Sequence, residues 1–272
     1  MNPAMRTVWH GAYERALKTI TSLRNHCDFK YDKETESAKE IKILNAYKPT
    51  IKKYTPGVPI EKEYIGATDM TLKLDQFYYF NISLDDIHRA QSVKGAMEAS
   101  AEEGAIGLSE EGDKYVASLV KAGVQAGTIE AIDGGAVTKT NAVDKVEDAF
   151  AVLYGNNCKV SESYWLEIAP SFHKVLRPSL TELLTNNVEM AKKGIVGRYG
   201  NANVTIENLL ATDDTSVYNQ LRTNHAIAFA EQINKVEPYR PDDAFEDALK
   251  GLYVFGALVT RPDEIVVLKT NK

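Results

Sequence analysis

A phosphate-binding site is the first chemistry to test. A P-loop needs the pattern G-x-x-x-x-G-K-[ST], in which backbone N–H groups surround the phosphate. The nearest match is "DGGAVTKT", which has Thr138 rather than glycine immediately before Lys139. The stretch "GIVGRYG" is not G-x-G-x-x-G and follows no clear strand of a βαβ unit, so it predicts a turn. The sequence therefore indicates no nucleotide or other cofactor site.

The residue types that bind metals or act as nucleophiles are scattered. The five histidines never fall at HxxxH spacing, and none lies in an Asp/Glu cluster of obvious metal geometry. Cys27 and Cys158 are far apart and outside any CxxC pair. This predicts free thiols rather than a disulfide framework or a zinc site, and it suits a reducing compartment. The serine pattern G-x-S-x-G is absent.

Pairs of adjacent aspartates remain, and they are interpreted as a helix cap, a loop tip and a turn. The pairs are Asp85/Asp86, Asp213/Asp214 and Asp242/Asp243. Two carboxylates do not supply the six oxygen ligands of a divalent ion, so we expect solvated pairs, with an ion at the second pair left open. Catalytic sites built from distant residues leave no local motif, so an enzyme is not excluded by motifs alone.

Composition describes a globular chain with an uneven charge. The 272 residues are 44% apolar, which suffices for one large domain or two modest ones. No signal-peptide core and no run of 18 apolar residues is present, so neither export nor a membrane span is indicated. The net charge of −6 divides into +3 for residues 1–80 and −9 for the remainder. A nucleic-acid reader would normally carry a clustered basic face on its body, so the distribution argues against one.

The front of the chain predicts a short helix followed by a long extended arm. Apolar residues recur at helical spacing over residues 7–24. Residues 45–80 alternate Tyr, Ile, Thr and Val with Lys and Glu, and Pro49, Pro56 and Pro59 exclude a continuous helix. Such an arm cannot bury itself, because alternate side chains are polar and its edges offer unpaired backbone groups.

A long helix is predicted next. Ser83 is the expected N-cap, and a helical pattern runs from Asp85 to about Val120. The interior glycines, at positions 95, 104, 107 and 112, predict a kink or break, although the small residues would also allow close packing.

The remaining chain mixes helices and strands. Residues 125–141 are rich in Gly, Thr and Ala and predict a loop, and residues 143–155 predict a helix. In "SESYWLEIAP" the alternation predicts Tyr164, Leu166 and Ile168 inward and Glu167 outward, with a helical turn from Pro170. Strand-like runs follow at 225–233, 251–259 and 264–268. Without a βαβ repeat, the fold class is α+β.

This order of elements resembles the major capsid proteins of tailed bacteriophages with the Hong Kong 97-type fold. "YTPGVPIEKEYIGATDMTLKLDQFYYFNISLDDIHRAQ" is similar to that family's arm-loop leading into its spine helix. "SESYWLEIAPSFHKVL" resembles a strand of its peripheral domain followed by a short helix, and "FEDALKGLYVFGALVTRPDEIVVL" its C-terminal strands. The resemblance covers nearly the whole chain.

The resemblance implies five segments. They are an N-arm with its short helix at 1–38, an extended arm-loop at 39–82, a spine helix at 83–123, a peripheral domain at 124–195 with 233–272, and an axial domain at 196–232. It also implies a structural, non-enzymatic subunit without cofactor or metal. Copies would assemble as hexamers and pentamers into an icosahedral head that encloses double-stranded DNA.

The resemblance extends to partners and location. It implies a separate scaffolding protein, because the chain has no room for a long scaffolding segment, and a portal. Assembly would take place in the host cytoplasm and yield the virion capsid. Two alternatives stay open: an encapsulin-like nanocompartment of the same fold, and a soluble α+β enzyme that uses the arm as a dimerisation strap.

The alternating composition of the arm is explained if the arm lies on an adjacent subunit that buries its apolar face. Its lysines would then pair with acidic residues of that subunit's body, mainly to set register. The assembly-interface candidates are Tyr47, Lys48, Lys52, Lys53, Tyr54, Lys62, Tyr64, Asp213 and Asp214.

Overall fold

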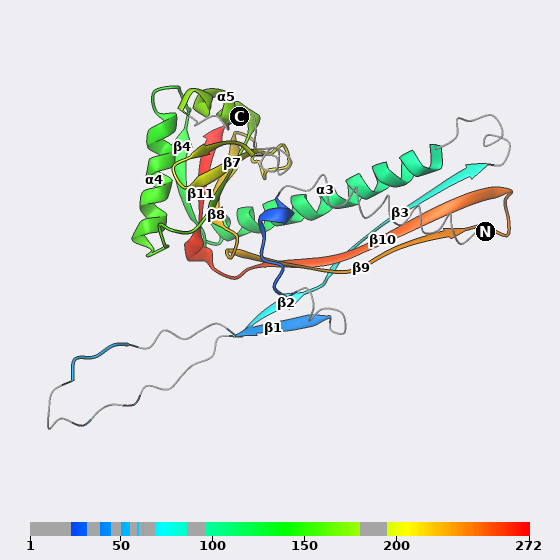
Figure 1. The fold of residues 1–272 in the computed structure, drawn as a ribbon, viewed down its shortest axis with the longest axis horizontal. Coiled ribbons are helices and arrows are strands. Elements are labelled where there is room, and N and C mark those ends of the chain that lie inside the picture. The colour runs from blue at the N-terminus through cyan, green and yellow to red at the C-terminus, as the bar shows by residue number, and fades with distance from the viewer. Residues whose placement is uncertain are drawn as a thin grey trace.

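Three β-sheets and one long helix make up most of the described chain (Figure 1). The computed structural model describes residues 23–31, 39–44, 50–54, 59, 62, 69–85, 96–179 and 195–272. The helix predicted for residues 7–24 lies outside these ranges except for its last two positions, which lead into the short 3-10 helix η1 (Arg24–His26). The class is α+β, as the sequence predicts.

An elongated unit combines the helix α3 (Ala96–Gln125) with a three-stranded antiparallel sheet in the order β3-β10-β9. The strands are β3 (Gln76–Asp85), β9 (Ile227–Tyr239) and β10 (Glu246–Val259). The helix runs along one face of this sheet (Figure 1). Tyr253 and Phe255 of β10 share a buried core with Val116 and Val120 of α3.

The predicted helix start is wrong, and the predicted break does not occur at Gly104, Gly107 or Gly112, while Gly95 lies outside the described residues. Ser83 belongs to β3 and pairs with Ala248 of β10, because pairing with the sheet prevails over the capping pattern. The helix α3 is continuous through Gly104, where an added Cβ would lie 3.1 Å from the ring of Phe80. On the sheet, a Cβ at Gly251 would lie 2.2 Å from the same ring. The small residues make room for Phe80 between helix and sheet, so they serve close packing.

The second unit is a six-stranded mixed sheet in the order β4-β11-β8-β5-β7-β6. Its strands are β4 (Glu130–Gly135), β5 (Tyr164–Ile168), β6 (Ile195–Tyr199), β7 (Ala202–Ile206), β8 (Ser216–Thr223) and β11 (Ile265–Asn271). The helices α4 (Ala142–Gly155) and α5 (Pro170–Leu176) share an apolar core with one face. The short turns η3 (Arg177–Ser179) and η4 (Pro262–Glu264) complete the unit.

Several sequence predictions are confirmed in the second half of the chain. The helix at 143–155 is α4, and the three C-terminal runs are parts of β9, β10 and β11. Two predictions are wrong in extent. The predicted loop at 125–141 contains β4, and "GIVGRYG" contains β6, with the turn confined to its end, where Gly200 has a φ of +52°.

The observed sheets combine strands from different predicted segments. The six-stranded sheet combines β7 and β8, from the segment predicted as axial, with β4, β5 and β11, from the segments predicted as peripheral. The three-stranded sheet combines β3, from the end of the predicted arm-loop, with β9 and β10. The roles of these segments in a shell stay a prediction.

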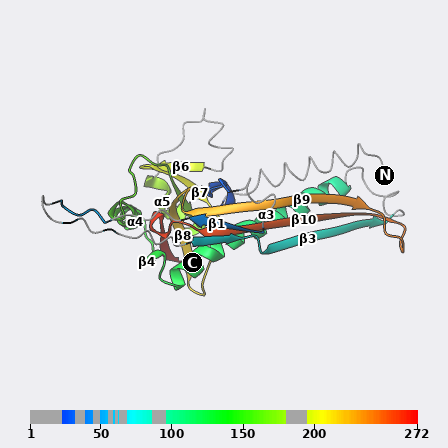
Figure 2. The ribbon, with the colours of Figure 1, turned by 90° about the horizontal axis from the view of Figure 1, so that it is seen from below.

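The arm folds back on itself at its base. The strands β1 (Glu40–Leu44) and β2 (Asp69–Lys73) pair antiparallel, so that Glu40 lies opposite Lys73. This two-stranded sheet lies beside the elongated unit (Figures 1 and 2).

Candidate assembly surfaces

The base of the arm is fixed to the three-stranded sheet. Apolar side chains of β1, β2, β9 and β10 form one buried cluster, which comprises Ile41, Ile43, Leu72, Leu74, Ala228, Ala230 and Val254. A Cβ at Gly256 of β10 would lie 2.0 Å from the carbonyl oxygen of Lys73, so only glycine permits this approach of the two backbones. The arm therefore starts from a packed base.

Beyond this base, the described part of the arm is exposed. Residues 50–54 are all exposed, with Ile51 at 95% and Tyr54 at 65%. They extend away from the three-stranded sheet in both views (Figures 1 and 2). One copy of the chain thus leaves two large apolar side chains in water, next to Lys52 and Lys53.

The predicted interface residues fall into three groups. Lys52, Lys53, Tyr54 and Lys62 are exposed on the arm. The candidates Tyr47, Lys48 and Tyr64 lie outside the described residues. Asp213 and Asp214 lie in the loop before β8, in a different part of the chain from the arm.

Asp213 has partners within its own chain. Its carboxylate accepts a hydrogen bond from the Tyr218 hydroxyl and lies 2.5 Å from Lys121 Nζ. These bonds, first the one from Lys121, hold the pKa of Asp213 below its ordinary value. The pair ties the loop to α3, which leaves Asp214 as the exposed acid. Within the part of the chain that the structure describes, no group of three or more His, Cys, Asp or Glu could hold a metal ion.

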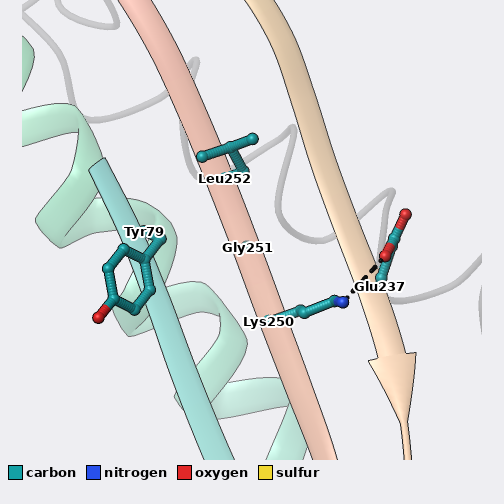
Figure 3. A pocket seen from close by; sticks show the side chains of 5 residues that line it. All are labelled: Tyr79, Glu237, Lys250, Gly251 and Leu252. Atoms are coloured by element: carbon teal, nitrogen blue, oxygen red, sulfur yellow. Dashed lines mark ion pairs between the residues drawn. The ribbon is translucent and has the colours of Figure 1, made fainter. Parts of the chain in front are cut away.

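The face of the three-stranded sheet that points away from α3 carries exposed apolar side chains. Phe77 is 64% exposed, Tyr79 77% and Leu252 38%. Tyr79 lies directly opposite Leu252 across β3 and β10, so both point to the same side (Figure 3). We call the surface of these three residues the open face. The sequence shows its β3 part as the alternation in "QFYYFNIS", which the prediction assigned to the arm.

Polar groups border the open face. Lys250 lies 3.3 Å from Glu237 of β9, and its ammonium group lies 5.4 Å from the centroid of the Tyr239 ring (Figure 3). Tyr79, Leu252, Lys250 and Glu237 line a depression of about 290 Å³. The open face therefore combines an apolar centre with a charged border, as protein interfaces do.

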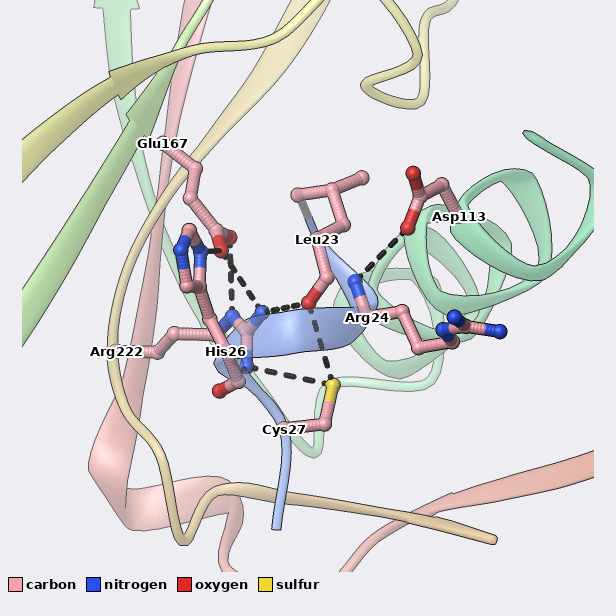
Figure 4. A network of polar contacts seen from close by, with 7 residues as sticks. All are labelled: Leu23, Arg24, His26, Cys27, Asp113, Glu167 and Arg222. Carbon is pink, nitrogen blue, oxygen red and sulfur yellow. Dashed lines mark hydrogen bonds and ion pairs between the residues drawn. The ribbon is translucent and has the colours of Figure 1, made fainter. Parts of the chain in front are cut away.

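A buried ionic network joins the two units under residues 23–29, which we call the strap. Arg222 of β8 is fully buried and donates from Nε and Nη2 to the two carboxylate oxygens of Glu167, at 3.0 and 2.8 Å (Figure 4). Its guanidinium also donates to the backbone carbonyls of His26 and Leu23, each at 2.8 Å. The His26 ring stacks on Trp165 with centroids 3.6 Å apart.

The strap is also bound to the elongated unit. The backbone N–H of Arg24 donates to Asp113 of α3 at 2.8 Å, and its guanidinium lies 3.1 Å from Glu231 of β9. Backbone bonds join Asp28 to Ile227 and Phe229 of β9. The strap therefore contacts α3 and both large sheets, which fixes the point where the N-terminal segment meets the body.

The predicted outward orientation of Glu167 is wrong. The alternation places it outward, but it is fully buried and paired with Arg222. Burial alone would raise the pKa of Glu167, but Arg222 and His26 hold it below its ordinary value. The neighbouring Cys27 thiol is inert, because burial raises its pKa to about 11. Sequence reasoning misses this network because its members lie far apart in the chain.

No helix among the described residues is long and apolar enough to cross a membrane.

Comparison with known proteins gives matches in structure alone. No protein-family model and no curated protein matches the sequence. A structure from Mycobacterium phage Che8 matches with a TM-score of 0.75 and 26% identity over 91% of this chain and 90% of that chain. The capsid structure of cyanophage P-SCSP1u matches at 0.67 and 15%, over 86% and 84%. A virus-like particle from Pyrococcus furiosus matches at 0.60 and 12%, over 97% and 99%.

The elongated unit, the six-stranded unit and the base of the arm together make the fold that these matched structures share. The chain has the Hong Kong 97-type fold of tailed-phage major capsid proteins, and the resemblance predicted from the sequence is confirmed.

Proposed function

We propose that the protein is a structural major capsid subunit that assembles with copies of itself into the icosahedral head of a tailed phage. The single observation that carries this proposal is the arm, which leaves a packed base and presents Ile51 and Tyr54 to solvent. A lone subunit gains nothing from such exposure, whereas a shell offers a neighbour to cover it. The capsid of cyanophage P-SCSP1u, which shares the fold, supports the same conclusion.

The arm of one copy docks on the open face of the next. Ile51 and Tyr54 would then pack against Phe77, Tyr79 and Leu252. Burying one such apolar side chain contributes about 1.5–3 kcal/mol, whereas an exposed ion pair contributes about 0–1 kcal/mol. Apolar contact therefore supplies most of the affinity.

Charge sets the register of this contact. Lys52 and Lys53 stand beside the apolar residues of the arm, while Glu237 and Asp85 lie along the receiving sheet. The +3 front of the chain and its −9 remainder have the same complementarity. A head-to-tail contact of this kind repeats around a closed ring without an unsatisfied end, which suits hexamers and pentamers.

The partners of the shell belong to the same proposal. A separate scaffolding protein and a portal would take part in assembly in the host cytoplasm, and the finished head would enclose double-stranded DNA. The subunit would act without catalysis or cofactor. The segments predicted as peripheral and axial would meet neighbouring subunits at different places in each ring.

A nanocompartment that encloses enzymes is the second candidate. The match to the virus-like particle from Pyrococcus furiosus keeps it open, but its TM-score of 0.60 is lower than the 0.75 of the phage Che8 structure. The content of purified particles separates the two functions. Packaged DNA in particles from infected cells supports the phage head, and a co-purifying enzyme supports the nanocompartment.

The arm is tested by two variants and a matched control. Deletion of Asn45–Gly66, or Lys52→Glu with Lys53→Glu, should leave a folded subunit with an unchanged circular dichroism spectrum. The yield of particles should fall at least about tenfold, because 1.4 kcal/mol at each contact already costs that factor. Lys139→Glu with Lys159→Glu makes the same change of charge at exposed residues outside the arm and should assemble normally. Normal assembly of the deletion variant would rule out the arm contact.

The open face is tested by a mixing experiment. One population carries Tyr54→Cys and the other Leu252→Cys, both with Cys158→Ser. Oxidation of co-assembled particles should give a disulfide-linked pair that contains one chain of each kind. Particles that form without this product would place the arm on another surface.

A further inference from the structure

A second feature of the interior is independent of assembly. Six polar or amphipathic side chains occupy one face of the central strands β5, β7 and β8 in two rows. In the first row Gln220, Glu167 and Thr205 are neighbours, and in the second Arg222, Trp165 and Asn203. The opposite face of the same strands carries the apolar core under α4 and α5. We call the six side chains the polar grid.

The charged members of the polar grid satisfy each other, but the neutral members do not. Within the described chain, five buried atoms of the grid have no hydrogen-bond partner in the protein. They are Trp165 Nε1, Asn203 Oδ1, Thr205 Oγ1, Gln220 Nε2 and Gln220 Oε1. Gln220 and Thr205 are each only 1% exposed, so bulk water does not reach them.

An unpaired buried polar group loses its hydration without compensation, and five of them would together cancel much of the stability of an ordinary domain. A folded chain therefore needs partners for these atoms. Buried polar groups that lack a protein partner are ordinarily bound by internal water, which makes about three hydrogen bonds.

The chemistry of the grid selects a neutral guest. It offers donors at Trp165 and Gln220, acceptors at Asn203 and Gln220, and a hydroxyl at Thr205 that can do either. Glu167 disfavours an anion and Arg222 disfavours a cation, and these two charges already neutralise each other. A small molecule that both donates and accepts, without net charge, meets all these conditions.

Spacing fits water. Side chains directly opposite each other on adjacent strands lie side by side on one face of the sheet, so a water can reach the polar ends of both with hydrogen bonds of about 2.8 Å. Trp165 and Asn203 are such neighbours across the parallel pair β5–β7, and Glu167 stands between Gln220 of the antiparallel neighbour β8 and Thr205 of the parallel neighbour β7. We propose that the polar grid is an internal water site, in which ordered waters join the neutral side chains to the Arg222–Glu167 pair beneath the strap.

The direct test is a map of the wild-type protein that resolves ordered water. Density within hydrogen-bonding distance of Gln220, Thr205 and the Trp165–Asn203 pair is expected. An interior without such density overturns the proposal. The test does not depend on shell assembly, since crystals of the unassembled subunit serve equally well.

The sign of the change in Tm on substitution at Thr205 gives a second test. Thr205→Val keeps the shape of the side chain and removes only the hydroxyl. If water binds there, the variant loses a hydrogen bond and its Tm should fall by about 2–4 °C. If the grid is dry, the same change removes an unpaired polar group, so a higher or unchanged Tm contradicts the proposal. Thr212→Val, at an exposed position, is the matched control and should leave Tm unchanged.

Discussion

Replacing Arg222 by methionine tests whether the ionic network under the strap holds the two units together. Arg222 makes two bonds to Glu167 and one each to the carbonyls of Leu23 and His26. The variant leaves a fully buried carboxylate that still contacts His26 Nδ1 at 2.8 Å. Removing one partner of a buried pair costs about 3–5 kcal/mol. For a chain of this size that corresponds to a Tm lower by roughly 6–20 °C.

The double variant Arg222→Met with Glu167→Leu is the decisive comparison. Replacing both members of a buried ion pair by apolar residues is often nearly neutral, so the double variant should recover most of the loss. Differential scanning fluorimetry and urea unfolding measure both proteins under the same conditions. A single variant as stable as the wild type, or a double variant as unstable as the single one, would refute the account of the network.

The remaining predictions concern packing, the open face and pH. Gly251→Ala should lower Tm, since the new Cβ would lie 2.2 Å from the Phe80 ring, and adding Phe80→Leu should restore part of the loss in the same unfolding assay. Tyr79→Ser with Leu252→Ser should leave the subunit folded but reduce particle yield in negative-stain images; normal yield would show that the open face is not an interface. The pKa of Glu167 is lower in the folded chain than its ordinary value of 4.5, so its contribution to stability is present above that pH and is lost as pH falls through the folded pKa. The difference in unfolding free energy between wild type and Glu167→Gln should therefore shrink below about pH 4.5, and a constant difference down to pH 2 would contradict this.

The elements that follow their own local pattern could be predicted from the sequence. The helix at 143–155 and the C-terminal strands have clear periodicity, and each forms as expected. The stretch "GIVGRYG" lacks such a pattern, and only pairing of β6 with β7 makes it a strand. Ser83 is a second example of tertiary pairing that overrides a local pattern. Its sequence context predicts a helix N-cap, but it pairs with Ala248 of β10 as part of a strand.

The candidate site divides in the same way. The exposed arm and its lysines could be predicted, because alternation and prolines act locally. The strap could not be predicted, since Leu23 and Arg222 are 199 positions apart and Glu167 looks like a solvent-facing residue in its strand. The sequence pattern places the β3 part of the open face in the arm, because its exposure depends on α3 covering only the other side of the sheet.

Negative-stain electron microscopy of the purified wild-type protein, after size-exclusion chromatography, tests the central claim most directly. The protein should be examined alone and co-expressed with the products of neighbouring genes. The account predicts hollow particles, capsomer rings or tubes built from many copies. A monomer or dimer in both preparations would contradict it.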